Sequence, residues 1–215
     1  MDDLVSKTVE FVKQKLQGAE AGHDWFHIER VWKLSIKLAE KESVNLEVIH
    51  LGALLHDIAD PKFHDGNEKI GPETACSFLQ SQQVEPEVIQ QVVFIIRNIS
   101  FKNRTETAKH KPIELQIVQD ADRLDAMGAI GIARLFNFGG FKNNPIHIPE
   151  EKPRLNFCKE EYKKSKGTSI NHFYEKLLLL KSMMNTPTGK EMAAIRHQYM
   201  EDFLQQFYNE WNVVV

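Results

Sequence analysis

The stretch HIERVWKLSIKL, from His27 to Leu38, has the spacing of an amphipathic helix with a polar residue on its apolar side. Val31, Leu34 and Leu38 recur at three- and four-residue steps, which place them on one face of a helix. His27 precedes Val31 by four residues, so it points with that apolar face. A histidine in this position is either a hydrogen-bonded core residue or a ligand for a metal ion.

Helical spacing recurs through the rest of the chain and predicts an all-α protein. The segment VVFIIRNI, residues 92–99, is rich in β-branched residues, but it follows Pro86, which suits a first helical turn, so a helix is expected there. The sequence contains no alternation of apolar and polar residues that would indicate a strand. Six of the expected helices have both ends marked by the pattern: Val5–Leu16, His27–Leu38, Ile49–Leu55, Ala129–Leu135, Ile170–Met184 and Thr188–Trp211. Three more are expected to begin at Pro72, Pro86 and Pro112.

The helical pattern predicts three regions. Residues 1–136 form a helical core, and residues 170–215 form C-terminal helices that pack on it. Residues 137–169 contain Gly139-Gly140 and several prolines, so an irregular segment is expected there. Irregular segments of this length are either functional lids or surface loops, and the sequence leaves both readings open.

The composition is that of an ordinary globular protein and restricts the classes of function. The chain has 215 residues, of which 42% are apolar and 27% charged, with a formal net charge of −3. This small charge argues against broad binding to nucleic acid. The chain has no apolar run approaching ~18 residues, so no membrane span is expected. The acidic N-terminus lacks the pattern of a signal peptide, and Cys76 and Cys158 form no CxxC pair, so a cytoplasmic protein is expected.

Further polar residues share the apolar faces of predicted helices. His56 follows Gly52 by four residues and points inward, and Asp57 comes next, at the end of that helix. Asp122 follows Val118 by four residues and is expected on a buried stripe. A buried ionised carboxylate is costly unless a positive charge neutralises it. Imidazole nitrogens and carboxylate oxygens together suit Mn²⁺, Fe²⁺, Co²⁺, Ni²⁺ or Zn²⁺. Taken one at a time, each histidine also fits a hydrogen-bonded core residue, and each aspartate also fits a helix cap or an ion-pair partner.

Three segments resemble the HD superfamily of metal-dependent phosphohydrolases: GHDWFHIERV (22–31), LLHDIAD (54–60) and DADRLDAMGAIGIAR (120–134). The segment SINHFYEKLLLLKSMMNTPTGKEMA, which begins at Ser169, is similar to a bacterial subgroup of small, stand-alone HD hydrolases. The resemblance implies an HD-domain helical bundle with a smaller C-terminal helical subdomain. It also implies four metal ligands, which are His27, His56, Asp57 and Asp122, with Asp125 as a second choice for the last of them.

The resemblance also indicates how many ions are bound. One dinuclear group of the superfamily has a second aspartate directly after the His-Asp pair, and here Ile58 occupies that position. Dinuclear cyclic-dinucleotide phosphodiesterases of the superfamily use extra histidines within a longer signature. This chain offers His64 and His110 but lacks that signature. One divalent ion is therefore expected, with Mn²⁺ favoured over Fe²⁺, Co²⁺, Ni²⁺, Zn²⁺ or Mg²⁺.

The activity that the resemblance implies is hydrolysis of a phosphorylated small molecule, expected to be a nucleotide. Its subgroup points to cleavage of ribo- or deoxyribonucleoside triphosphates to a monophosphate and pyrophosphate. A 5′-nucleotidase and a non-catalytic nucleotide sensor are the alternatives. A third alternative is a helical adaptor protein whose inward histidines are only core residues. Stoichiometric metal in the purified protein would exclude this alternative. No nucleic acid or membrane partner is expected.

Helper residues are predicted around the four ligands. Asp60 lies one turn after His56 and could orient or deprotonate water, although it also reads as a polar residue at a helix end. His23 lies one turn before His27 and is predicted as a catalytic residue that supports the site or contacts phosphate, although it also reads as a neighbour of the helix cap. Candidate substrate contacts, each of which also reads as a surface or ion-pair residue, are Arg30, Lys62, Arg123, His172 and Lys176.

Overall fold

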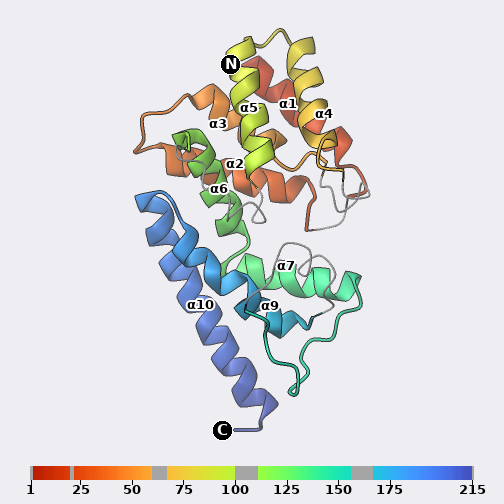
Figure 1. Ribbon diagram of the computed structural model, residues 1–215, viewed down its shortest axis with the longest axis vertical. Helices are drawn as coiled ribbons and strands as arrows, with labels where there is room; N and C mark the ends of the chain where they lie inside the picture. The colour runs from red at the N-terminus through yellow and green to blue at the C-terminus, as the bar shows by residue number, and fades with distance from the viewer. Residues whose placement is uncertain (1, 20–21, 60–66, 100–110, 156–166, 215) are drawn as a thin grey trace. The chain divides into compact units, whose positions relative to one another are not determined.

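All regular elements in the part of the chain described by the computed structural model are helices, as the sequence predicts (Figure 1). The described residues are 2–19, 22–59, 67–99, 111–155 and 167–214. The chain divides into two compact units, residues 1–122 and residues 123–215. None of the helices in these ranges has the length and apolar character needed to cross a membrane.

The first unit is built around a largely apolar helix. This helix is α3, Leu46–Leu55, which packs against α1 (Asp2–Lys15), α2 (Trp25–Ala39) and α5 (Pro86–Asn98). Seven of its ten residues are buried, which is expected of a helix surrounded by others. In addition, α4, Ile70–Ser81, packs on α5.

Local signals set where these helices begin. The Asp24 side chain caps α2 by accepting a hydrogen bond from the backbone N–H of His27, with a donor–acceptor distance of 3.0 Å. The Asn45 side chain caps α3 in the same way, and Pro86 occupies the first turn of α5. The apolar face of α2 buries Ile28, Val31 and Leu38 almost completely; burial of each such side chain contributes roughly 1.5–3 kcal/mol.

Helix α6, Ile113–Asp125, carries the last residues of the first unit. Its buried side includes Leu115, Val118 and Ala121, none of which is more than 1% exposed. Within this unit the Gln119 side-chain amide donates a hydrogen bond to the carbonyl oxygen of Asn98, at 2.8 Å. This bond joins α6 to the end of α5, three residues before Asp122, and so helps to fix the position of that aspartate.

The second unit contains α7 (Gly128–Phe141), α9 (Ser169–Glu175), a 3₁₀ helix η3 (Leu177–Met183) and α10 (Pro187–Trp211). Its apolar centre is a group of aromatic rings, in which Phe173 stacks on Phe203 with their centroids 5.7 Å apart. Phe136 contacts both rings, and Phe173 is fully buried. Helix α10 begins at a cap formed by the Thr186 hydroxyl, with Pro187 in the first turn.

Two expectations about this region are corrected. The helix expected from Ile170 to Met184 is interrupted at Lys176, whose φ of −143° is not helical, and it continues as η3. The buried residues of η3, Leu177 and Leu180, are three apart, which is the period of a 3₁₀ helix, so the tighter winding keeps both inside. The helix expected to end at Leu135 continues to Phe141.

The longer α7 means that the irregular segment begins after residue 141 instead of at 137. Gly139 is buried inside α7, where a Cβ atom would lie 2.5 Å from the Ser169 hydroxyl oxygen. A glycine here therefore permits close packing of α7 on α9. The described part of the segment is anchored to α9, because the buried Glu175 carboxylate accepts hydrogen bonds from the backbone N–H and Nε of Arg154. Residues 156–166, which belong to the segment with a possible role as a lid, lie outside the described ranges. The division into 1–136, 137–169 and 170–215 remains a prediction.

Candidate metal centre

Two histidines and an aspartate from α2 and the end of α3 meet in the first unit. His27 projects from α2, His56 forms the C-cap of α3, and Asp57 follows it. One ligating atom from each of the three lies within 4.8 Å of the others. The Nε2 atoms of His27 and His56 are 3.3 Å apart, and both histidines are buried.

Asp122 from α6 completes this group. Its Oδ1 atom lies 3.6 Å from Nε2 of His27 and 3.9 Å from Nε2 of His56. The expectation that Asp122 is buried is wrong, since its side chain is 35% exposed. The carboxylate is partly open to solvent although it lies close to both buried histidines. We call His27, His56, Asp57 and Asp122 the ligand cluster.

Other aspartates of α6 are more deeply buried but are placed differently. Asp120 is fully buried, and Asp125 is 1% exposed. In the second unit the Asp125 carboxylate pairs with Arg134 at 2.8 Å, and its charge also acts on Arg196. Asp125, the second choice for the last ligand, therefore has an ion-pair partner.

The hydrogen bond of His56 fits a role as metal ligand. Its Nδ1 lies 2.8 Å from the carbonyl oxygen of Ala53. A carbonyl can only accept, so Nδ1 carries the proton and, in the neutral ring, Nε2 presents a lone pair. That lone pair faces Nε2 of His27 and Oδ1 of Asp122. Two imidazole nitrogens and two carboxylates are a donor set that suits a borderline divalent ion.

His23 extends the cluster on the side of Asp57. Its Nδ1 lies 2.7 Å from Oδ2 of Asp57, and both side chains are 17% exposed. Burial alone raises the pKa of the Asp57 carboxyl, but the hydrogen bond from His23 and positive charge on His23, His56 and His27 outweigh this effect. The net result is a pKa far below the ordinary value for aspartate, so Asp57 is an anion at neutral pH.

The other predicted helper residues are distributed over both units. Arg30 lies on α2, three residues after His27, and is partly buried. Arg123 is buried in the second unit, where Nη1 donates a hydrogen bond to the carbonyl oxygen of Met183, so at least one of its donors is already used within the fold. His172 lies on α9 and Lys176 at its C-cap, also in the second unit. The predicted positions Asp60 and Lys62, and the histidines His64 and His110, lie outside the described residues.

Asp24 is a site residue that the sequence analysis missed. By capping α2 it holds the backbone of His27 at the start of the helix. The signal was present, because an aspartate directly before the first apolar-periodic residues is typical of an N-cap. Asp24 affects the site only by positioning the backbone of His27. A search for the spacing of metal-ligating residues therefore does not find it.

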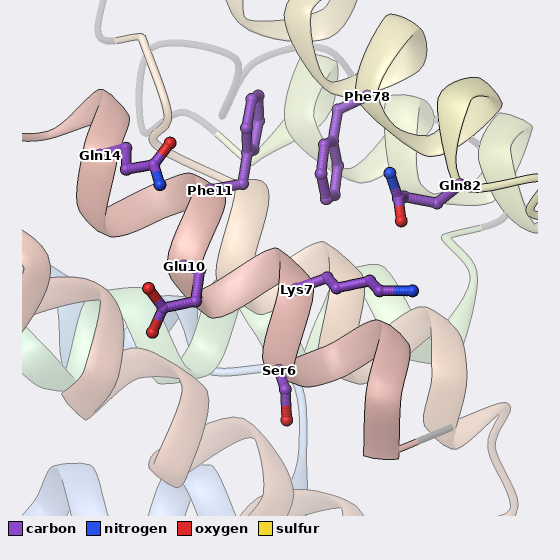
Figure 2. A pocket seen from close by; sticks show the side chains of 7 residues that line it. All are labelled: Ser6, Lys7, Glu10, Phe11, Gln14, Phe78 and Gln82. Atoms are coloured by element: carbon purple, nitrogen blue, oxygen red, sulfur yellow. The ribbon is translucent and has the colours of Figure 1, made fainter.

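A pocket in the first unit is separate from the ligand cluster. It lies between α1 and α4, has a volume of about 500 Å³, and is open to solvent (Figure 2). Phe11 and Phe78 both line it and stack on each other with centroids 4.0 Å apart. Its lining contains none of the cluster residues and consists of Ser6, Lys7, Glu10, Phe11, Gln14, Phe78 and Gln82.

Comparison with known proteins identifies a family domain that covers the ligand cluster. The HD domain family matches residues 25–127, a range that contains all four members of the ligand cluster. The uncharacterized protein YpgQ of Bacillus subtilis is 37% identical over 197 residues, which cover 91% of this chain and 88% of YpgQ.

Solved structures extend the likeness over the whole length. An HD-superfamily hydrolase of Bacillus thuringiensis is 43% identical with a TM-score of 0.77, and 98% of each chain is covered. A protein of Lactobacillus plantarum is 36% identical with a TM-score of 0.87, and 99% of each chain is covered. The structure of B. subtilis YpgQ in complex with ADP has a TM-score of 0.75 at 32% identity and covers 97% of this chain and 95% of YpgQ.

Proposed function

The chain belongs to the HD superfamily of hydrolases, and from this premise we propose that it is a divalent-metal-dependent hydrolase of nucleotides that converts ribo- or deoxyribonucleoside triphosphates to monophosphate and pyrophosphate. The observation that carries the proposal is the convergence of His27, His56, Asp57 and Asp122 on one point. The complex of the relative YpgQ with ADP supports a nucleotide as the ligand.

In this proposal the ligand cluster holds one divalent ion, expected to be Mn²⁺. When bound, the ion supplies electrophilic stabilisation of charge on phosphoryl oxygens and lowers the pKa of water. The chain's own residues prepare for it: Asp57 supplies negative charge in a largely buried position, and His56 presents its Nε2 lone pair. The negative charge of Asp57 and the hydrogen bond that orients the His56 ring are both present without the ion.

The remaining roles concern the substrate and the attacking water. Arg30, one helical turn from His27, is proposed to contact a phosphate, and its guanidinium geometry suits two phosphate oxygens at once. Lys62, His172 and Lys176 are proposed as further contacts with phosphate or base. Asp60 is proposed to orient water or to accept its proton as attack occurs in line with the leaving pyrophosphate.

The test is product identification. We expect that purified protein supplied with Mn²⁺ and a panel of nucleoside triphosphates releases pyrophosphate and a nucleoside monophosphate in equal amounts, separable by chromatography. The same panel should include nucleoside monophosphates. Release of inorganic phosphate from those, without pyrophosphate from triphosphates, would replace the proposal by a 5′-nucleotidase. Tight binding of nucleotides without any product would replace it by a sensor.

A further inference from the structure

His23 and Asp57 form a hydrogen-bonded pair at the edge of the ligand cluster. The distance from Nδ1 of His23 to Oδ2 of Asp57 is 2.7 Å, which is short for a bond between nitrogen and oxygen and typical of a charged acceptor. An ionised carboxylate can only accept, so the Nδ1–H of His23 is the donor. His23 itself lies directly before Asp24, the cap of α2, so its backbone is tied to the same helix start as His27.

Asp57 differs from the other members of the cluster in its place in the fold. His27 and Asp122 lie inside helices, and the His56 ring is held by its bond to Ala53. Asp57 follows the end of α3 in a turn, and its Oδ2 accepts the hydrogen bond from His23. A carboxylate that can rotate offers an incoming ion several orientations, and fixing one of them before binding reduces the entropic cost of coordination.

We propose that His23 is a positioning residue, whose Nδ1–H holds Oδ2 of Asp57 so that the carboxylate presents one orientation to the divalent ion. This inference rests on the proposed metal site and deepens it. In this role His23 acts through Asp57 and does not ligate the ion. This role requires a hydrogen-bond donor at the position of Nδ1. Substitutions that keep the donor or keep the ring can therefore distinguish it from a role in packing.

Three substitutions at His23 separate the donor from the ring. His23→Asn carries an amide nitrogen that branches from Cγ, as Nδ1 does, and can keep the bond to Asp57. His23→Gln places the same amide one carbon further out, near the position of Nε2, and His23→Phe keeps a ring of similar size without any donor. A matched control is His50→Phe, because His50 on α3 also has a hydrogen bond through Nδ1, from Nε1 of Trp32 at 2.9 Å.

The measurement is the dissociation constant for Mn²⁺ alone, obtained by titrating metal-free protein and counting free Mn²⁺ by electron paramagnetic resonance. We expect His23→Phe and His23→Gln to raise the dissociation constant by about 10- to 100-fold, as is usual when the partner of a metal ligand is lost. His23→Asn and His50→Phe should stay close to the wild-type value. Circular dichroism of each variant checks that the helices are retained.

The proposal is overturned if folded His23→Phe binds Mn²⁺ as tightly as wild type, or if His23→Asn is as weak as His23→Phe. Because the titration contains no nucleotide, its outcome is independent of the substrate. Wild-type protein that binds Mn²⁺ but hydrolyses no nucleotide would refute the proposed function and leave the role of His23 standing. Wild-type protein that binds no divalent ion would refute both.

Discussion

Replacement of His56 by alanine is expected to abolish stoichiometric binding of the divalent ion and to lower phosphohydrolase activity by about a thousandfold. The reason is that Nε2 of His56 lies 3.3 Å from Nε2 of His27 and 3.9 Å from Oδ1 of Asp122, in the centre of the ligand cluster. Loss of the ion removes several kcal/mol of transition-state stabilisation, which corresponds to roughly this factor in rate. Metal content by mass spectrometry and the rate of pyrophosphate release measure the two effects.

A second histidine on the same helix provides the control. His50 lies on α3 and accepts a hydrogen bond from Nε1 of Trp32, which is not a member of the ligand cluster. His50→Ala should therefore retain one ion and most of the activity, although it loses a hydrogen bond that contributes about 1 kcal/mol of stability. A His56→Ala protein that is folded and still carries one tightly bound ion would refute the assignment of the cluster.

Replacement of Phe173 by alanine is expected to reduce the free energy of unfolding of the second unit by about 3–5 kcal/mol. Phe173 is fully buried, stacks on Phe203 with centroids 5.7 Å apart, and also contacts Phe136. Alanine would leave a cavity at the point where α7, α9 and α10 share their apolar side chains. Urea unfolding followed by far-ultraviolet circular dichroism measures the loss.

A phenylalanine from the same unit gives the matched comparison. Phe141, the last residue of α7, is 58% exposed. Phe141→Ala removes the same atoms from a position already in contact with water, so its effect should stay within about 0.5 kcal/mol. Equal losses from Phe141→Ala and Phe173→Ala would show that the aromatic group is not the centre of this unit.

Helix identity was predictable because most apolar faces repeat with the helical period over several turns. The segment 92–99 shows this best, since its β-branched residues favour a strand while the preceding Pro86 and the spacing favour the helix that is observed, α5. The break at Lys176 was not predictable in the same way. Four consecutive leucines follow it, and such a run fits an α-helix and a 3₁₀ helix equally well until the neighbouring elements determine which leucines are buried.

The ligand cluster shows what spacing can and cannot establish. The inward positions of His27 and His56 follow from the period of their own helices and are observed. Burial was the wrong criterion for Asp122, because Asp120 and Asp125 are the more deeply buried aspartates of α6. Both the spacing from Val118 and the resemblance to HD proteins favour Asp122, and its distances to both histidines agree with that choice.

The pairing of His23 with Asp57 could not be predicted from either sequence segment alone. The two residues are 34 positions apart and meet only because α2 packs against α3. The four-residue spacing of His23 and His27 indicates that both side chains lie on one helical face. The helical period within one segment gives no information about a partner on another helix. Contacts of this kind depend on the packing of two elements and become visible only in the folded unit.

The most direct test of the metal-dependent mechanism is a titration of metal-free wild-type protein with Mn²⁺, in which bound ion and pyrophosphate released from a nucleoside triphosphate are followed in the same sample. The arrangement of His27, His56, Asp57 and Asp122 predicts that pyrophosphate release rises in proportion to bound ion and reaches its maximum at one ion per chain. Pyrophosphate release that is unchanged by removal of the ion would contradict this mechanism, as would a fully loaded protein that releases none from any nucleotide.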